Sequence, residues 1–289
     1  MIRKRIAAMM GERTELLPVY ERFPFFIRDS RIESTIDMHA HEFFEIDMIL
    51  DGSGTNETRT GKNPVSTGDI VLGNQFEGHA LIPGPSLGVR SIKFGRSLLE
   101  DDFSARLLLP FISRLPEFRA KLPLEKSVRA DVFAVSSALV SEYEGQKAHW
   151  ERTVVSLFSA VLTMIYRSYE TYASRRGIRV SETAQPLITS ILAYLDANYT
   201  TDLRIAAMLK QFSISASHAN TVFKRATGRS IKDYLTVKRL ARARKLLAET
   251  TTPISDICFA AGFSDISNFN RAFKAFTGKA PGEFRRDPR

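Results

Sequence analysis

The chain has 289 residues, of which 44% are hydrophobic and 25% are charged, and its formal net charge is +9. This length allows two domains with separate cores, and the balance of apolar and charged residues argues against a disordered or membrane-embedded protein. The single cysteine, Cys258, excludes a framework of intrachain disulfides, suits a reducing cytoplasm and is expected in a helix core. The apolar run of residues 6–10 is too short for a signal peptide, so we expect a cytoplasmic protein.

The first part of the chain has the pattern of a β domain. After an irregular arm, the apolar runs 43–50, 70–72 and 89–94 predict strands. The segment Asp51-Gly52-Ser53-Gly54 predicts the turn that ends the first of these strands. Short strands separated by Gly, Asn and Asp favour a small barrel or sandwich.

A histidine motif lies at the start of this β region. His39-x-His41-x-x-x-Glu45, with Gly52 after it, resembles the first cupin motif, and His79 stands where the second motif supplies its histidine. Two histidines separated by one residue of a strand point to the same side, so these four side chains are candidates for a 3-His-1-carboxylate metal site. The second motif is incomplete, because Glu77-Gly78-His79 lacks the usual Pro-x-Gly.

The character of the chain becomes helical after residue 94. Residues 129–144 place their apolar side chains on one stripe, and residues 153–166 contain no charge. Fourteen residues are too few to span a bilayer, which needs about 20. A helix that is apolar almost all round is covered on several sides, either by a second subunit or by a helical layer of the same chain. We expect a dimerisation layer here.

The excess positive charge lies in the last third of the chain. Residues 171–184 are polar and predict a linker between a domain of residues 1–170 and a domain of residues 185–289. Residues 184–289 hold 17 Lys and Arg against 8 Asp and Glu, so the rest of the chain is neutral. An excess confined to one domain is the electrostatic signature of a surface that binds phosphates.

This basic segment contains an internal repeat. Phe223-Lys224-x-x-Thr227-Gly228 recurs fifty residues later as Phe273-Lys274-x-x-Thr277-Gly278. Two short helical segments joined by a turn precede the end of each copy, and a glycine stands there at the position that closes a helix. This is the plan of a helix-turn-helix unit. Ser215 is expected to cap the first recognition helix, residues 216–226, and Thr201 or Asp202 to cap the helix before it. Ser230-x-x-Asp233 predicts a capping box for a long helix of about 27 Å that joins the two units.

The second repeat resembles the DNA-binding domain of the AraC/XylS family of transcription regulators. The resemblance rests on Ile257-Cys258-x-x-Ala261-Gly262-Phe263-Ser264-Asp265 and the residues that follow it to Arg285. The first repeat matches less well, since Ser213 stands where the family usually has glycine, and a non-glycine residue in a left-handed turn costs roughly 1 kcal/mol. The resemblance implies an α+β protein with an N-terminal cupin-like sensor barrel, a helical dimerisation layer, and two helix-turn-helix units joined by a long helix.

The resemblance also implies the site residues. Base contacts in this family match exposed positions of both recognition helices, where Asn suits adenine and Arg suits guanine, and basic residues at the helix ends suit phosphates. The expected DNA-binding residues are Ser217, His218, Asn220, Thr221, Lys224 and Arg225 in the first unit, and Ile266, Ser267, Asn270, Arg271 and Lys274 in the second. Regulators of this family often keep the barrel without a metal, so His39, His41, Glu45 and His79 are expected to bind a small organic effector.

We therefore predict a sequence-specific transcription regulator, an activator by resemblance, that is not an enzyme and carries no cofactor. Its expected partners are double-stranded DNA, a small-molecule effector for which the resemblance suggests a sugar, RNA polymerase, and a second copy of the chain. The alternative from another class is a metal-dependent cupin enzyme fused to a DNA-targeting module. A third alternative is a nucleic-acid-binding protein without sequence preference.

Overall fold

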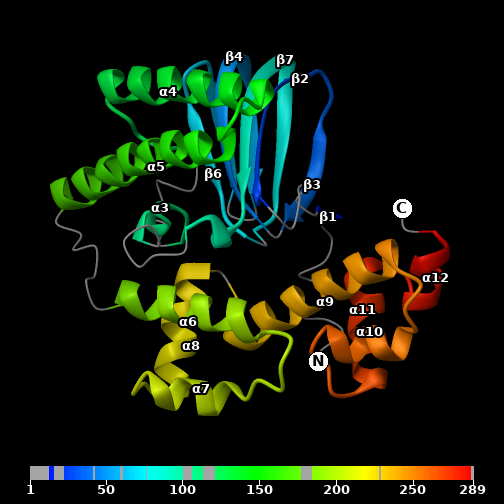
Figure 1. The fold of residues 1–289 in the computed structure, drawn as a ribbon. Helices are drawn as coiled ribbons and strands as arrows, with labels where there is room; N and C mark the ends of the chain where they lie inside the picture. Colours follow the sequence, from blue (N-terminus) through cyan, green and yellow to red (C-terminus); the bar gives the residue numbers. More distant parts are fainter. Residues whose placement is uncertain are drawn as a thin grey trace. The chain divides into compact units, whose positions relative to one another are not determined.

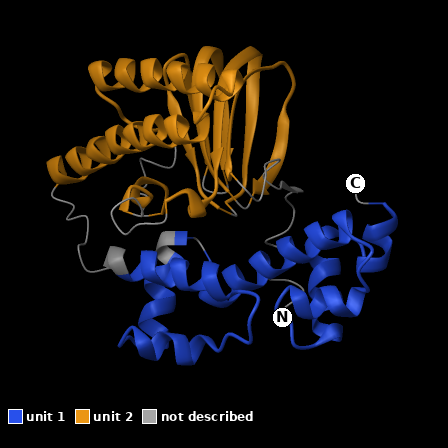
Figure 2. Ribbon diagram, viewed as in Figure 1, with its two compact units in different colours: residues 1–14, 187–289 blue, residues 15–186 orange. Residues whose placement is uncertain are grey.

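The computed structural model shows two compact units, Glu15–Pro186 and Leu187–Arg289, the second together with Met1–Thr14 (Figures 1 and 2). An antiparallel sheet with helices makes up the first unit and helices make up the second, which agrees with the expected α+β class. The residues that the structure describes are 13–15, 23–41, 43–58, 61–75, 77–99, 106–112, 121–176, 184–227 and 229–287, with the backbone alone for 13–15, 184–186 and 225–226.

Two long antiparallel strands form the centre of the sheet, β4 (Phe44–Thr58) and β7 (His79–Phe94). β6 (Ile70–Gly73) and β5 (Gly61–Ser66) pair with the first and second halves of β4, while β2 (Phe25–Ile32) and β3 (Ile36–His41) pair with the two halves of β7. The short strand β1 (Arg13–Glu15) lies next to β3 at the edge. Each half of the sheet therefore has its own flanking strands around one shared central pair.

The predicted turn at residues 51–54 is wrong, because β4 continues through it to Thr58. The pairing of β4 with β7 instead shifts its register between Ile49 and Asp51 and again between Gly52 and Gly54. Gly52 has φ +88°, and a Cβ built on it would lie 2.4 Å from the Ser86 carbonyl oxygen. These glycines bring two backbones close together at an irregularity inside a strand, which is the role of glycine in a β-bulge.

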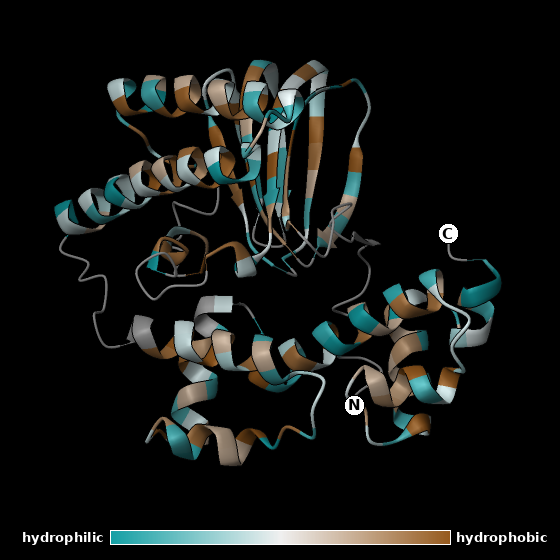
Figure 3. Cartoon of the chain, in the orientation of Figure 1, coloured by the Kyte–Doolittle hydropathy of each residue, from teal (hydrophilic) through white to brown (hydrophobic). Residues whose placement is uncertain are grey.

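The two faces of the sheet differ in polarity because side chains alternate along β4. Phe44, Ile46 and Met48 are fully buried on one face, whereas Glu45 and Asp47 point to the other. The apolar face packs against α3 (Leu109–Ile112) and α5 (Trp150–Arg175), and α4 (Lys126–Gly145) packs on α5 and β2 (Figures 1 and 3). The opposite face, called the polar face below, also holds a buried apolar cluster that includes Ile49, Val71 and Leu81, and its polar side chains are the candidates for a binding site.

The chargeless run of residues 153–166 lies inside α5. Its buried side chains, including Phe158 and Val161, face one side, while Ser156 and Ala160 are exposed. Helix α5 continues to Arg175 and so includes the first residues of the expected linker, and residues 177–183 of that linker lie outside the described part. Among the described residues, no helix is both long and apolar enough to cross a membrane.

The second unit contains seven described helices. They are α6 (Ala184–Asn198), α7 (Ile205–Gln211), α8 (Ala216–Thr227), α9 (Ile231–Glu249), α10 (Ile254–Ala260), α11 (Ile266–Thr277) and α12 (Pro281–Arg286). The pairs α7–α8 and α10–α11 are the two helix-turn-helix units, and α9 contacts helices of both. Phe223 packs on Tyr234 in the first unit, and Phe269 packs on Phe273 in the second. Cys258 is buried in this core, and burial raises the pKa of its thiol, as expected of a core cysteine.

Most of the predicted caps are present. The Ser215 hydroxyl accepts a hydrogen bond from the His218 N–H at 3.3 Å, and the Ser230 hydroxyl accepts one from the Asp233 N–H at 3.1 Å. Gly278 ends α11 with φ +78°, whereas Gly228 lies outside the described residues. The expected cap at Thr201 or Asp202 is wrong, since α7 begins only at Ile205 and the Thr201 hydroxyl instead donates to the Asn198 carbonyl at the end of α6.

The turns of the two helix-turn-helix units differ. Residues 212–215 join α7 to α8, and residues 261–265 join α10 to α11, so the first turn is shorter by one residue. The left-handed position is Ser213 (φ +52°) in the first turn and Gly262 (φ +92°) in the second. A Cβ on Gly262 would lie 2.4 Å from the Tyr199 carbonyl oxygen, so only the second turn requires glycine for space as well as for conformation.

We expect Ser213→Gly to stabilise the first helix-turn-helix unit by up to about 1 kcal/mol. The substitution removes left-handed strain of roughly 1 to 2 kcal/mol, and the greater freedom of glycine in the unfolded chain offsets about 0.4 to 1 kcal/mol of this. Amide hydrogen exchange in α7 and α8 should slow by up to about fivefold. Gly262→Ala is the matched control and should accelerate exchange in α10 and α11. Faster exchange in α7 and α8 of Ser213→Gly would contradict the prediction.

Candidate functional site

The outer face of α11 carries a row of exposed polar side chains. Ser267, Asn270, Arg271 and Lys274 are exposed at the spacing of one helix face, while Phe269 and Phe273 are fully buried on the opposite face. The four exposed residues line a groove of about 880 Å³ that also includes the start of α12. Helix α11 thus presents hydrogen-bonding groups and two cations on one accessible surface.

The start of α11 is fixed by a local hydrogen-bond network. The Asp265 carboxylate accepts a hydrogen bond from the Asn268 N–H at 2.5 Å, which caps the helix. The Arg271 guanidinium donates to the side-chain oxygen of Asn268, an exposed residue that the sequence analysis missed although it lies three residues before Arg271. Ile266 is 39% exposed, which is unusual for a large apolar side chain.

The corresponding face of α8 is exposed at four of the expected residues, Ser217, His218, Thr221 and Lys224. Asn220 differs, because it is half-buried and its side-chain oxygen accepts a hydrogen bond from the Ile231 N–H at 3.2 Å. Its amide nitrogen donates to the Ala216 carbonyl at 3.0 Å, so both ends of the amide have partners inside the protein. Asn220 joins α8 to the start of α9. The side chain of Arg225 lies outside the described residues.

A second cluster lies on the polar face of the sheet. His41 at the end of β3, Glu45 on β4 and His79 at the start of β7 bring their ligand atoms within 4.8 Å of one another. Glu45 Oε2 lies 3.1 Å from His41 Nε2 and 3.3 Å from His79 Nε2, and Glu45 Oε1 lies 3.4 Å from Lys93 Nζ. The ring of His39 lies 4.5 Å from that of His79, so all four residues of the histidine motif are neighbours.

Charges perturb this cluster strongly. Burial alone would raise the pKa of Glu45, but the charges and hydrogen bonds of His41 and His79 outweigh it and hold the pKa well below its usual range. Burial, together with the charge of Glu45, raises the pKa of Asp47 to about 7, although the Ser91 hydroxyl donates a hydrogen bond to this carboxylate at 2.5 Å. Two carboxyl groups on one strand face therefore have opposite shifts.

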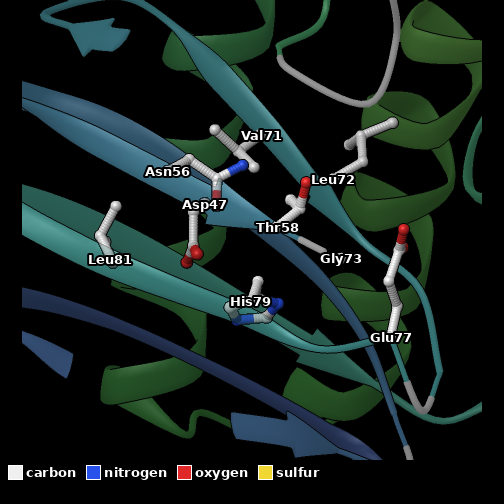
Figure 4. Close-up of a pocket in the computed structure, with 9 residues that line it drawn as sticks. All are labelled: Asp47, Asn56, Thr58, Val71, Leu72, Gly73, Glu77, His79 and Leu81. Atoms are coloured by element: carbon white, nitrogen blue, oxygen red, sulfur yellow. The ribbon is translucent and has the colours of Figure 1, made fainter. Parts of the chain in front are cut away.

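A small cavity lies beside His79, as Figure 4 shows. Its volume is about 10 Å³, which is close to the space of one water molecule. Its lining includes Asp47, Asn56 and Thr58, which the sequence analysis did not single out. The sequence pattern that could have identified them is a pair of polar residues two positions apart in a strand, as in Glu45 with Asp47 and Asn56 with Thr58. The bulges between the two pairs hide their common face from a simple alternation count.

Comparisons with known proteins match the helical C-terminal segment alone in some cases and most of the chain in others. A helix-turn-helix domain model matches residues 208–287. The Msm operon regulatory protein of Streptococcus mutans is 31% identical over 100 residues, which span 35% of this chain but only 36% of that relative's length. The activator RhaR of Mannheimia succiniciproducens is 21% identical over 268 residues, which cover 92% of this chain and 93% of the relative.

Solved structures also match residues of both units of this chain. ToxT of Vibrio cholerae, bound to (E)-4-(8-methylnaphthalen-1-yl)but-3-enoic acid, superimposes over 91% of this chain and 98% of its own with a TM-score of 0.54 and 14% identity. At this identity the likeness concerns the fold. These matches confirm the resemblance to the AraC/XylS family of transcription regulators. The matched segment contains α8 and α11, the second helices of the two helix-turn-helix units, and the histidine cluster lies in the N-terminal sheet domain.

Proposed function

We propose that the chain is a sequence-specific transcription activator that binds double-stranded DNA through residues 187–289. The observation that carries this proposal is the exposed face of α11, on which Ser267, Asn270 and Arg271 stand beside Lys274 in one groove. Base edges are read by hydrogen-bonding side chains and phosphates are held by cations, so a helix with both on one face suits a major groove. The confinement of the whole positive excess to residues 184–289 supports the same proposal.

In α11 we assign base contacts to Ser267, Asn270 and Arg271. Ile266 is exposed at the helix start, where it suits an apolar contact with a thymine methyl group. Lys274 lies further along the helix and suits a phosphate. This division makes α11 the helix that carries most of the specificity.

In α8 we assign base contacts to Ser217, His218 and Thr221, and phosphate contacts to Lys224 and Arg225. Asn220, which the sequence analysis included among the base contacts, is now assigned to the scaffold because its amide already bonds to Ile231 and Ala216. Breaking these bonds to contact a base would leave a half-buried backbone N–H without its partner. The first unit therefore has a weaker base-reading face than the second.

For the rest of the chain, we propose that residues 1–170 form a cupin-like sensor barrel and that residues 171–184 link it to residues 185–289. His39, His41, Glu45 and His79 are its proposed effector site, supported by their convergence on the polar sheet face. A sugar or an acid of the size bound by ToxT is far larger than the cavity of about 10 Å³ beside His79, so such a ligand would require this face to open. RNA polymerase is the partner expected of an activator.

The histidine cluster is also the observation that favours the alternative of a metal-dependent enzyme fused to a DNA-binding module. The cavity of about 10 Å³ beside the cluster is as small for a substrate as it is for an effector, whereas the matched relatives are regulatory proteins by name. We therefore prefer a sensing role for the cluster.

We also propose that the chain forms a homodimer through α5, and Leu157→Glu tests this. Leu157 is half-buried in the chain, whereas Val161 is fully buried, so a charge at residue 157 can disrupt a subunit contact without breaking the core. Sedimentation should show a wild-type dimer and a monomeric variant with unchanged far-UV circular dichroism. A monomeric wild-type protein at micromolar concentration would contradict the proposal.

Selection of binding sites from randomised DNA by the full-length protein tests the main proposal. We expect a defined site, and an affinity that falls steeply with salt as phosphate contacts require. Enrichment of no site, with the same salt dependence, would indicate nucleic-acid binding without sequence preference. Binding without any salt dependence would contradict the assignment of Lys224 and Lys274.

A further inference from the structure

We infer that His41, Glu45 and His79 bind one divalent transition-metal ion. This inference adds a metal ion to the proposed effector site, and it rests on the proposed function only for the regulatory role of the ion. The binding itself is argued from the geometry of the three side chains, the backbone hydrogen bond of His41, and the space around them.

The spacing of the three ligand atoms fits a metal site. Two ligands that each lie about 2.0 to 2.1 Å from Zn²⁺ at a tetrahedral angle are about 3.3 Å apart. Glu45 Oε2 lies 3.1 Å from His41 Nε2 and 3.3 Å from His79 Nε2, so both separations already match an edge of such a tetrahedron. Two imidazoles and one carboxylate are the ligands of many zinc and iron sites in proteins.

The hydrogen bond of His41 to the backbone points the same way. Its Nδ1 lies 2.8 Å from the Phe43 carbonyl oxygen, which only accepts hydrogen bonds, so Nδ1 carries a proton. Nε2 is then the ring atom that faces the Glu45 carboxylate, at 3.1 Å from Oε2, and it is free of the backbone contact that holds Nδ1. A backbone carbonyl that fixes the tautomer of a histidine in this way is the usual outer partner of a metal ligand.

The backbone leaves room for these ligands. A Cβ on Gly73 of β6 would lie 3.1 Å from Glu45 Cβ and 3.4 Å from the Cε1 and Nε2 atoms of His41. A side chain at this position would therefore press on two of the three ligands. Gly73 and His79 also border the cavity of about 10 Å³, so a fourth position for water lies next to the cluster, near the polar side chains of Asp47 and Thr58 (Figure 4).

Lys93 is the competing cation, because its Nζ lies 3.4 Å from Glu45 Oε1. It approaches the carboxylate oxygen that does not face the two histidines, so the ammonium and a metal ion can share the carboxylate. Without a metal ion, His41 can donate hydrogen bonds from both ring nitrogens, to Phe43 and to Glu45, only as an imidazolium. This second cation would be fully buried beside the Lys93 ammonium. The arrangement with a metal ion predicts that the protein binds added metal, and the arrangement with an imidazolium predicts that it does not.

The test is titration of the full-length, tag-free protein with Co²⁺ after removal of metal by a chelator. We expect the visible absorption of coordinated Co²⁺ to saturate at one equivalent per chain, and Zn²⁺ to displace it. Glu45→Gln and His79→Gln should each weaken binding by more than about 100-fold, since outer partners of metal ligands alone are worth about 10- to 100-fold. His149→Asn removes a histidine outside the cluster and should leave binding unchanged.

Absence of stoichiometric Co²⁺ binding by the wild-type protein would overturn the inference, and so would equal binding by Glu45→Gln and His79→Gln. If Glu45→Gln does not fold, His79→Gln decides, because that side chain is 12% exposed at the edge of the cluster. The titration contains no DNA, so its failure leaves the proposed DNA binding untouched. Failure of site selection from randomised DNA would in turn leave the metal site standing.

Discussion

Phe158→Ala is expected to lower the free energy of unfolding of the N-terminal unit by about 3 to 5 kcal/mol. The Phe158 ring projects from α5 onto the sheet, with its centroid 5.1 Å from that of Phe25 on β2 and 4.7 Å from that of Phe94 on β7. All three rings are fully buried. The substitution removes an aromatic side chain from the centre of this cluster, and the rigid sheet on one side limits how far the cavity can collapse.

Trp150 makes this loss measurable for one unit alone. It is the single tryptophan of the chain and packs edge-on against Phe23 and Tyr143, so urea unfolding followed by its fluorescence reports the N-terminal unit. Phe158→Leu should cost less than Phe158→Ala, because it fills part of the space. Phe259→Ala, at a side chain that is 57% exposed on α10, should leave this transition unchanged. A loss below about 1 kcal/mol for Phe158→Ala would show that α5 does not hold the sheet.

The helical domain was predictable because its signals are local. Ser215 and Ser230 each satisfy backbone groups within three residues of themselves, and Gly278 ends α11 by its own conformation. Two of the three features lie inside or next to the repeated segment. A repeat that carries its own caps and stops fixes helix boundaries almost without help from the rest of the fold.

The sheet was less predictable because its irregularities depend on distant partners. A run such as Asp51-Gly52-Ser53-Gly54 has the composition of a turn and also of a bulge. The choice between them depends on the Ser86 carbonyl, 34 residues away, which approaches Gly52 so closely that only glycine fits. The residues around Gly52 alone do not predict this contact with Ser86.

The candidate sites divide in the same way. The spacing of His39 and His41 puts both side chains on one side of β3, and Glu45 follows four residues later on β4. Lys93 and the cavity wall at Asn56 come from other segments and carried no motif. Asn220 had the right residue type and position for base contact, but whether it faces outward depends on how the start of α9 lies against α8. The Ile231 N–H at the start of α9 donates a hydrogen bond to the Asn220 side chain and holds it inside the protein.

Arg271→Ala is expected to cost about 1 to 3 kcal/mol of binding free energy on the cognate site and to relax the preference at one base position. Arg271 is exposed on α11, and its guanidinium is steadied by the side chain of Asn268, which reduces the rotamer freedom that it would lose on binding a guanine. Asn268→Ala should therefore weaken binding at the same base position, but by less than Arg271→Ala.

Lys224→Ala is the matched comparison for Arg271→Ala, because it removes a cation from the exposed face of the other recognition helix. A phosphate contact carries no sequence information, so this variant should weaken all sequences alike and lower the slope of the logarithm of affinity against salt by about one. The measurement is a panel of single-base variants of the selected site at two salt concentrations. A uniform loss for Arg271→Ala across the panel would show that Arg271 holds a phosphate, and α11 would then anchor the protein on DNA without reading guanine through this residue.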